Sequence, residues 1–323
     1  MIIDNERDVT AAVLAQAAHT PDPRLREIVT LAVKHLHAFV REARLNELEF
    51  QQICRAVAAA GQATNASHNE VVLAAGSLGV SALVCLLNNL PPGQEEAGTT
   101  ANLMGPFWRM HSPRTENGGS IVRSPTPGEP VFVEAFVVDG QGSPVAGAEV
   151  DVWHASPEGF YENQDPGQAD MNLRGKFTTD AAGRIALRTV KPVGYPVPVN
   201  GPVGTLLRAQ GRHNVRPAHL HFLITRAGFK AQFSQVYSDD DPHVEDDVQF
   251  GVTRALIAHY ERHDPAAGAA PPAPDVTGPW YTLSRRFVLE AGELRLPPAP
   301  VSGKAEGERP VMTRLSARPS APG

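Results

Sequence analysis

The central segment of the chain reads Val131-Phe132-Val133-Glu134-Ala135-Phe136-Val137-Val138, and the pair Asp139-Gly140 follows it. A run of β-branched and aromatic residues favours an extended strand, and an Asp-Gly pair favours a turn. Similar runs cover residues 148–153, 183–190, 219–225, 233–238 and 281–289, with Gly- and Pro-rich stretches between them. Many short strands separated by turns predict a β-sandwich, which we expect over residues 101–292.

The chain before residue 100 has a helical period instead. Asp22-Pro23 can begin a helix, because aspartate caps the first amides and proline tolerates the first turn. The apolar residues that follow recur at helical spacing and share one face: Leu25, Ile28, Val29, Ala32, Leu36, Phe39 and Val40. The sequence therefore predicts an N-terminal helical domain over residues 1–100.

Helix boundaries inside this domain are marked by capping residues. Two pairs fit the capping-box pattern, in which a polar cap is followed three residues later by glutamate: Asn46 with Glu49, and Ser67 with Glu70. We expect the helix after Asn46 to end near Gly61, and the helix after Ser67 to break near Gly76.

The C-terminal segment has a different composition. From residue 293 the chain consists largely of Pro, Ala, Gly, Ser and charged residues, with little to bury, so we expect residues 293–323 to be a disordered tail. The whole chain is predicted to be mostly β, with a sandwich core; residues 144–150 and 179–184 resemble the prealbumin-like type of sandwich.

Composition excludes several classes of function. Of the 323 residues 42% are hydrophobic and 20% charged, and the net charge of −6 provides no positive stripe for nucleic acid. The two cysteines, Cys54 and Cys85, match no zinc motif, and we interpret them as buried, reduced thiols. The chain shows no secretion signal and no run of about 18 apolar residues that would span a bilayer. We therefore expect a soluble, cytoplasmic protein.

One segment contains two histidines at a spacing that suits a metal site: Arg216-Pro217-Ala218-His219-Leu220-His221-Phe222. Residues i and i+2 of a strand point to the same face, so His219 and His221 present two imidazoles side by side. Such a pair suits a transition metal. The alternative is a solvated strand face with two polar residues.

Two tyrosines lie in Gly/Pro-rich loops, Tyr161 in Gly159-Phe160-Tyr161 and Tyr195 in Gly194-Tyr195-Pro196. A phenol has a pKa near ~10, so only a strong Lewis acid such as ferric iron keeps it ionised at neutral pH. The alternative is that each tyrosine only covers an edge of the core.

Other polar clusters have simpler interpretations. The acidic residues 239–241 and 245–247 match no calcium loop, and we expect a solvated acidic loop there. Trp153 is expected in the core, and the remaining ten histidines show no ligand spacing.

Several motifs in order resemble the intradiol ring-cleavage dioxygenases, the catechol and hydroxyquinol 1,2-dioxygenase family. The resemblance extends over roughly residues 25–290 and includes the N-terminal helices. Besides the histidine and tyrosine motifs above, it rests on Gly105-Pro106-Phe107, on residues 144–155, on Leu173-Arg174-Gly175-Lys176-Phe177-Thr178-Thr179-Asp180, and on Gly211-Arg212-His213.

The resemblance implies one Fe(III) per subunit. Its ligands would be Tyr161, Tyr195, His219 and His221, with Tyr195 also accepting a proton from the diol. Arg216 would stabilise negative charge on the substrate, which suits its permanent positive charge. Gln235 would be an amide near the same site, or alternatively an ordinary strand glutamine.

The implied substrate is an aromatic 1,2-diol that is cleaved by O2 between its hydroxyl-bearing carbons. Residues 194–204 favour hydroxyquinol (benzene-1,2,4-triol), giving 3-hydroxy-cis,cis-muconate or maleylacetate; catechol or a substituted catechol, giving cis,cis-muconates, is the alternative. Two residues depart from the hydroxyquinol pattern: Gly76, where an aspartate is usual, and Trp108. By resemblance the pocket is lined by Leu73, Gly76, Leu103, Gly105, Pro106, Phe107, Val197, Pro198 and Val252.

Two other functions stay open at this point. A metal-free, prealbumin-like binding module would not need Tyr161, Tyr195, His219 and His221 together. A zinc or ferrous enzyme built on His-x-His usually adds a carboxylate ligand. The resemblance also implies a homodimer formed through the N-terminal helices, with a phospholipid held between the subunits.

Overall fold

The computed structural model describes residues 2–89, 99–309 and 311–317. Its contacts divide the chain into two compact units, Met1–Ala58 and Ala59–Gly323. This division falls inside the helical region, whereas the sequence predicts a boundary near residue 100. The difference arises because the last two helices of that region belong to the second unit.

The first unit is helical, and two of its helices begin where the capping residues predict. It contains α1 (Glu6–Ala17), α2 (Pro23–Ala43) and the first part of α3 (Glu47–Ala63). Asp22 caps α2 by accepting a hydrogen bond from the Leu25 amide at 2.8 Å. Asn46 and Glu49 form the expected reciprocal pair, with both hydrogen bonds at 3.0 Å.

The second predicted capping box is wrong. Asn69, not Ser67, caps α4 (Glu70–Ser77), by accepting from the amide of Val72 at 3.0 Å. The Glu70 carboxylate contacts His68 at 2.7 Å and accepts from the Val203 amide at 2.8 Å, so a tertiary contact uses the group that would have closed the box. α3 continues past Gly61 to Ala63, and α5 (Val80–Asn89) begins after a break at residues 78–79.

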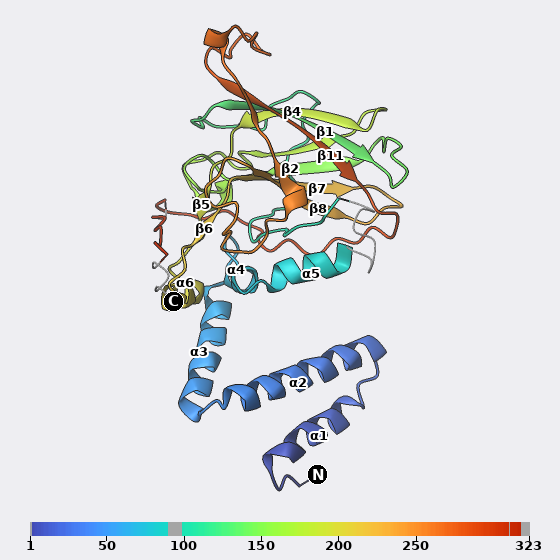
Figure 1. Cartoon of the computed structure of the whole chain (residues 1–323), viewed down its shortest axis with the longest axis vertical. Helices are drawn as coiled ribbons and strands as arrows, with labels where there is room; N and C mark the ends of the chain where they lie inside the picture. The colour runs from blue at the N-terminus through green and yellow to red at the C-terminus, as the bar shows by residue number, and fades with distance from the viewer. Residues whose placement is uncertain (1, 90–98, 310, 318–323) are drawn as a thin grey trace. The chain divides into compact units, whose positions relative to one another are not determined.

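The second unit is built around two stacked sheets, visible as layers in Figure 1. The first sheet has the order β10-β11-β1-β4 and comprises Glu261–His263, Trp280–Val288, Pro130–Val138 and Arg184–Val190. The second has the order β3-β2-β7-β8-β9 and comprises Arg174–Thr178, Glu149–Trp153, His219–Thr225, Gln232–Ser238 and Ile257–Ala258.

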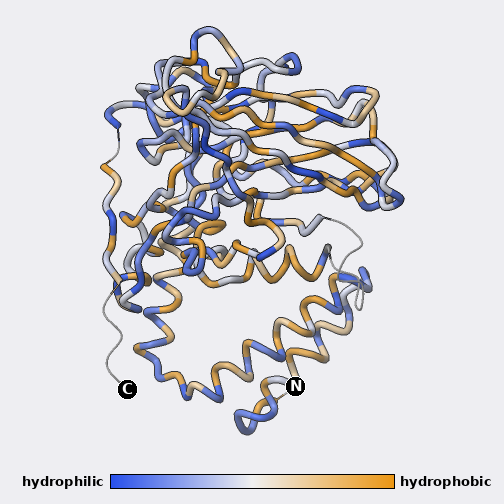
Figure 2. Tube along the Cα trace, turned by 45° about the horizontal axis from the view of Figure 1, so that its top comes forward, coloured by the Kyte–Doolittle hydropathy of each residue, from blue (hydrophilic) through white to orange (hydrophobic). Residues whose placement is uncertain are grey.

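One apolar core joins the two sheets. Alternate residues of β1 point into it from the first sheet, and Leu220, Phe222 and Ile224 point into it from β7 of the second. The rings of Phe222 and Phe287 lie 4.8 Å apart across the core. Figure 2 shows the apolar stretches that run along these strands. The sheet-rich core predicted from the alternation is confirmed.

Several short strands, turns and one helix of the second unit are not predicted by the sequence patterns. These include the strands β3, β9 and β10. They also include the ribbon of β5 (Tyr195–Pro196) with β6 (Val215–Arg216), the helix α6 (Pro202–Gln210), and the 3-10 turns η1 (Glu162–Gln164), η2 (Arg254–Leu256) and η3 (Pro265–Ala267). Helices hold more residues than strands over the described chain, so "mostly β" is wrong for the chain as a whole.

The described part of the C-terminal segment is packed against the second unit rather than disordered. Val301 is buried, Lys304 donates to the carbonyl of Gln168, and the Ala305 amide donates to the Asn163 carbonyl at 2.7 Å. Farther along, the Leu315 amide donates to Asn214 Oδ1 at 2.8 Å. A few backbone and apolar contacts are enough to fix a segment whose composition alone predicts disorder.

Two further expectations concern membrane-spanning helices and the two cysteines. Within the described residues no single helix is long and apolar enough to cross a membrane; one bent pair, Glu70–Ser77 with Val80–Asn88, passes such a test by length and composition only. Neither cysteine forms a disulfide in this part of the chain. Cys54 is exposed, contrary to the expectation of a buried thiol, and Cys85 is half-buried.

Phe287→Ala is expected to destabilise the protein strongly, because Phe287 is fully buried between the sheets. Removing a core phenylalanine costs about 3–5 kcal/mol of the free energy of unfolding. The control is Phe132→Ala, since Phe132 is half-buried and its ring lies under Arg188, a contact of about 1 kcal/mol. Chemical denaturation measures both, and equal losses would contradict this core assignment.

Candidate metal centre

Four donor side chains converge beside β7, the central strand of the second sheet. Tyr161 Oη lies 2.9 Å from both Tyr195 Oη and His221 Nε2, and His219 Nε2 lies 3.1 Å from His221 Nε2. All four side chains are buried. The structure therefore brings together every residue that the sequence singled out as a metal ligand.

Local backbone structure explains why they meet. His219 and His221 alternate with the core residues of β7, so both face away from the core. Tyr195 is placed by the pairing of β5 with β6, in which it lies opposite Arg216. Tyr161 follows Gly159, whose φ of +88° and close approach to Tyr195 both favour glycine: a Cβ there would lie 3.2 Å from Tyr195 Cβ.

Both imidazoles are held in the neutral form that ligates metals. His219 Nδ1 lies 2.7 Å from the Pro217 carbonyl, to which it donates, leaving the Nε2 lone pair directed at the cluster. Burial, reinforced by the Arg216 charge, lowers the pKa of His219 to about 3. Burial and the neighbouring His219 lower the pKa of His221 well below its usual range.

The two phenols favour a cation at the centre of the cluster. Burial, and then the neighbouring Tyr195, raise the pKa of Tyr161 well above its usual range, and burial also raises the pKa of Tyr195. A bound cation would offset this penalty by stabilising the phenolates. Ligand atoms about 2.0–2.1 Å from one metal at right angles are about 3 Å apart, as these donors are. The donor set therefore fits a metal ion.

Aromatic rings form the walls of the cluster. Trp153 stacks on His221, with ring centroids 4.7 Å apart and planes 8° from parallel. Phe107 packs on Tyr161 at 4.8 Å. Trp153 is thus buried, as expected, but it also fixes the plane of a candidate ligand. His221 Nδ1 is buried and has no hydrogen-bond partner among the described residues.

Arg216 is the buried cation beside the four donors. Its Nη1 lies 3.3 Å from His219 Nε2, and its Nε and Nη2 donate to the two carboxylate oxygens of Asp247 at 3.1 and 2.9 Å. The Asp247 carboxylate helps to raise the pKa of Arg216 well above its usual range, against the effect of burial, and the guanidinium in turn lowers the pKa of Asp247. The expectation of a solvated acidic loop is wrong for Asp247, which is buried because it balances the charge of Arg216.

Gln235 and Tyr237 complete the surroundings of Arg216. They lie on β8 directly opposite His221 and His219 in the register of β7 with β8. Arg216 Nη2 donates to Gln235 Oε1 at 3.0 Å and to Tyr237 Oη at 2.9 Å, and Gln235 Nε2 donates to the Leu103 carbonyl at 2.7 Å. Gln235 thus joins the site, and Tyr237 is a member that the sequence reasoning missed, although its spacing of two from Gln235 offered a signal.

A second buried ionic network holds the Tyr161 segment. Glu162 accepts from Arg174 Nε at 2.6 Å and from Arg109 Nη1 at 2.9 Å. Arg174 Nη2 also donates to the Phe107 carbonyl at 2.8 Å. Because Glu162 directly follows Tyr161, these contacts fix both the candidate ligand and the adjacent wall.

The predicted pocket residues separate into groups. Leu73 and Val197 share one small core cluster, while Gly105 approaches His221 so closely that a Cβ would lie 3.2 Å from its Cε1. Leu103, Gly105 and Pro106 line a cavity of about 340 Å³. Val252 lines a different cavity, of about 550 Å³.

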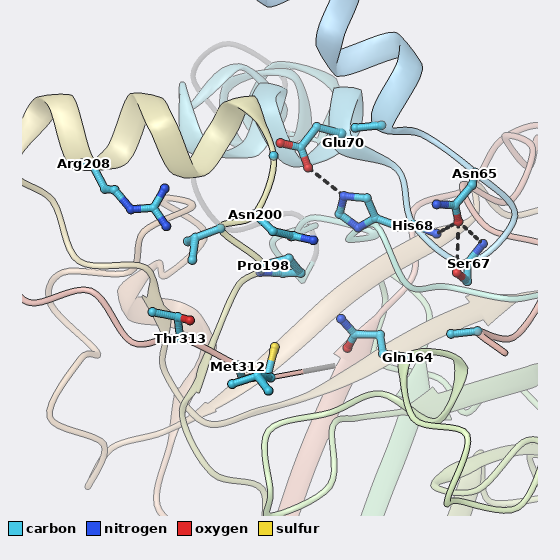
Figure 3. Close-up of a pocket in the computed structure, with 15 residues that line it drawn as sticks. Asn65, Ser67, His68, Glu70, Gln164, Pro198, Asn200, Arg208, Met312 and Thr313 are labelled. Atoms are coloured by element: carbon cyan, nitrogen blue, oxygen red, sulfur yellow. Dashed lines mark hydrogen bonds and ion pairs between the residues drawn. The ribbon is translucent and has the colours of Figure 1, made fainter. Parts of the chain in front are cut away.

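Pro198 and Gly76 have other surroundings. Pro198 borders a cavity of about 650 Å³, shown in Figure 3, with Glu70 and His68 on one side and Gln164 and Met312 on the other. The Glu70 carboxylate is already engaged there by His68 and by the first turn of α6. Gly76 lies on the buried side of α4, against Gln249, a residue that the sequence reasoning did not consider.

Three polar residues without ligand spacing in the sequence come together elsewhere: His213, His243 and Asp246, whose potential ligand atoms lie within 4.8 Å of one another. The amide of Val215 donates to His213 Nδ1 at 3.0 Å, so the Nε2 of neutral His213 carries the proton and faces Asp246 at 3.2 Å. His243 Nδ1 also contacts Asp246, at 2.9 Å. This arrangement is a hydrogen-bonded triad, since the lone pair of His213 is already used.

Comparisons with known proteins agree on one family. The family model for the catechol dioxygenase N terminus matches residues 22–96, and the dioxygenase model matches residues 103–274. The chain is 39% identical to the hydroxyquinol 1,2-dioxygenase of Rhizobium sp. (strain MTP-10005) over 258 residues, which cover 80% of this chain and 86% of the relative.

Solved structures give the same result. The hydroxyquinol 1,2-dioxygenase of Pseudomonas putida DLL-E4 is 36% identical, with a TM-score of 0.77 and coverage of 89% of this chain and 99% of that one. The catechol 1,2-dioxygenase of Pseudomonas arvilla C-1 is 29% identical, with a TM-score of 0.76 and coverage of 94% and 96%. With both family models matched in order along one chain, the protein belongs to the intradiol ring-cleavage dioxygenases and is an enzyme of that class.

Proposed function

We propose that this enzyme cleaves hydroxyquinol with O2 between its two adjacent hydroxyl-bearing carbons, giving 3-hydroxy-cis,cis-muconate or its keto form, maleylacetate. The observation that carries the proposal is the buried convergence of two phenols and two neutral imidazoles beside Arg216. The relatives named as hydroxyquinol dioxygenases support the triol as first substrate. Catechol or a substituted catechol is the second candidate, supported by the similarity to a catechol enzyme.

The proposed cofactor is one Fe(III) per subunit, held by Tyr161, Tyr195, His219 and His221. Bound iron would supply the Lewis acidity that ionises the diol and prepares its ring for reaction with O2. Two phenolates suit a ferric ion better than a zinc or ferrous ion, for which a carboxylate ligand is usual. The binding-module alternative gives no reason for burying four such donors together at a cost in desolvation.

The protein residues have separate proposed roles. Tyr195 takes a proton from a diol hydroxyl at its Oη, which burial favours because it raises the pKa of that phenol. Arg216 stabilises the negative charge that develops on the ring as O2 attacks, and Gln235 and Asp247 hold its guanidinium in place. Trp153 and Phe107 keep the ligand rings in position and exclude water.

The proposed diol pocket consists of the residues implied by the resemblance. Its walls are Leu73, Gly76, Leu103, Gly105, Pro106, Phe107, Val197, Pro198 and Val252. Support comes from the contact of Gly105 with His221 and of Phe107 with Tyr161. Pro198 and Val252 each border a further cavity of their own.

The assembly and location are also proposals. We propose that residues 101–292 carry the catalytic site and that the N-terminal helices form a homodimer, with a phospholipid between the subunits. Exposed apolar residues along α2, among them Leu36 and Phe39, support such an interface. Two cysteines that form no motif suit a reducing compartment, and we place the enzyme in the cytoplasm.

Tyr161→Phe and His221→Ala are expected to lose both bound iron and diol cleavage while remaining folded, because each removes one of four proposed ligands. Metal analysis, oxygen consumption and circular dichroism measure the three properties. Tyr260→Phe is the matched control: Tyr260 is equally buried but donates to the Val236 carbonyl, away from the cluster. Wild-type iron content in both ligand variants would refute the site.

Asp247→Asn is expected to reduce kcat/KM for the diol by about 10–100-fold while iron stays bound, because Arg216 loses its paired charge. Asp246→Asn is the control, since the neighbouring Asp246 is largely exposed. Steady-state kinetics with metal analysis distinguishes the two. An unchanged kcat/KM in Asp247→Asn would show that the ion pair has no catalytic role.

Analytical ultracentrifugation at micromolar concentration is expected to give about twice the mass of one chain. The double variant Leu36→Glu with Phe39→Glu is expected to shift the protein to the monomer, because it buries charge in the proposed interface. Mass spectrometry of an organic extract tests for the lipid. A wild-type monomer would count against both the dimer and the lipid.

A further inference from the structure

The Gln249 side chain is buried without its polar groups being fully satisfied. Only 2% of the residue is exposed, and its Nε2 has no hydrogen-bond partner in the described part of the chain. Leaving a buried amide unpaired costs free energy, and such groups are rare in folded proteins. A ligand that supplies the missing partner would remove this cost.

The amide is accommodated by the absence of a side chain at Gly76. A Cβ on Gly76 would lie 2.9 Å from both Cδ and Oε1 of Gln249, and 3.3 Å from Nε2. Any larger residue at position 76 would therefore push the amide away. Gly76 and Gln249 are a matched pair, one providing the space that the other fills.

The position of Gln249 is fixed relative to the ion pair of Arg216 with Asp247. Its backbone amide donates to Asp247 Oδ1 at 3.1 Å, and the Gly251 amide donates to Asp247 Oδ2 at 2.9 Å. The same carboxylate holds Arg216. On the other side, Asn102 Nδ2 donates to the Gly251 carbonyl at 2.5 Å. The backbone that carries the amide is thus fixed relative to the site.

Gln249 shares a cavity with three residues of the proposed diol pocket. Gln249 lines the same cavity of about 340 Å³ as Leu103, Gly105 and Pro106. Gly105 in turn backs onto His221. Most of the surrounding surface is apolar, and the Asn102 side chain in the same wall already bonds to Gly251 and to the Leu103 amide. An unpaired amide in such a wall can discriminate between ligands by a single hydrogen bond.

We propose that Gln249 determines substrate specificity: its Nε2–H donates a hydrogen bond to the third ring hydroxyl of a benzenetriol, and Gly76 leaves the space for it to do so. This inference rests on the proposed function. Catechol lacks the third hydroxyl and leaves the amide unpaired, whereas the triol pairs with it. The enzyme therefore prefers the triol.

The test compares kcat/KM for hydroxyquinol with kcat/KM for catechol in iron-loaded enzyme. Gln249→Met keeps the length of the side chain and removes its polar atoms, so the triol-to-catechol ratio is expected to fall about 10-fold or more. Gly76→Ala is expected to lower the ratio in the same direction by displacing the amide, and alanine favours the helical backbone of α4. Gln141→Met, in an exposed turn, is the matched control and keeps the wild-type ratio.

Binding is measured separately by anaerobic titration with each diol, where the Kd for the triol should rise in Gln249→Met relative to that for catechol. An unchanged ratio in both variants, with wild-type cleavage of hydroxyquinol intact, would overturn the role of Gln249 and leave the proposed function standing. A wild-type enzyme that is iron-loaded and cleaves neither diol would overturn the proposed function itself.

Discussion

The two-residue repeat of β7 is the constraint on which the rest of the molecule depends. Leu220, Phe222 and Ile224 fill the core between the sheets, so His219 and His221 must face the other way. A shift of one residue in the register of β7 would exchange the core for the donors. The core and the candidate metal centre are therefore fixed by one strand, and neither can change without the other.

Buried charge is arranged around this strand in two balanced groups. Arg216, beside His219, is paired with Asp247, and Arg174, over the Tyr161 ring, is paired with Glu162. Breaking such a pair by removing one partner leaves an unpaired buried charge, which costs about 3–5 kcal/mol. Each ion pair has a positional role, because it holds in place a segment that supplies a donor or a charge to the site.

The sequence predicts the parts of this structure that rest on local patterns. The long strands, the caps of α2 and α3, and the two histidines follow from periodicity and capping chemistry. The remainder depends on tertiary contacts. Glu70 serves α6 rather than its own helix, Asp247 belongs to Arg216 rather than to solvent, and the C-terminal segment packs through backbone hydrogen bonds that its composition does not reveal. The proposed role of Gln249 could not be predicted from the neighbouring sequence, because the placement of its amide depends on the absence of a side chain at Gly76.

In the proposed centre, two phenolates and two imidazoles bind the ferric iron at which the diol reacts. The decisive measurement for this centre is the visible spectrum of the purified, iron-loaded protein, recorded without oxygen before and after addition of hydroxyquinol. We expect a wine-red band from phenolate-to-iron(III) charge transfer that moves to longer wavelength when the diol is added. An iron-loaded but colourless protein, or one that takes up no iron, would contradict the claim.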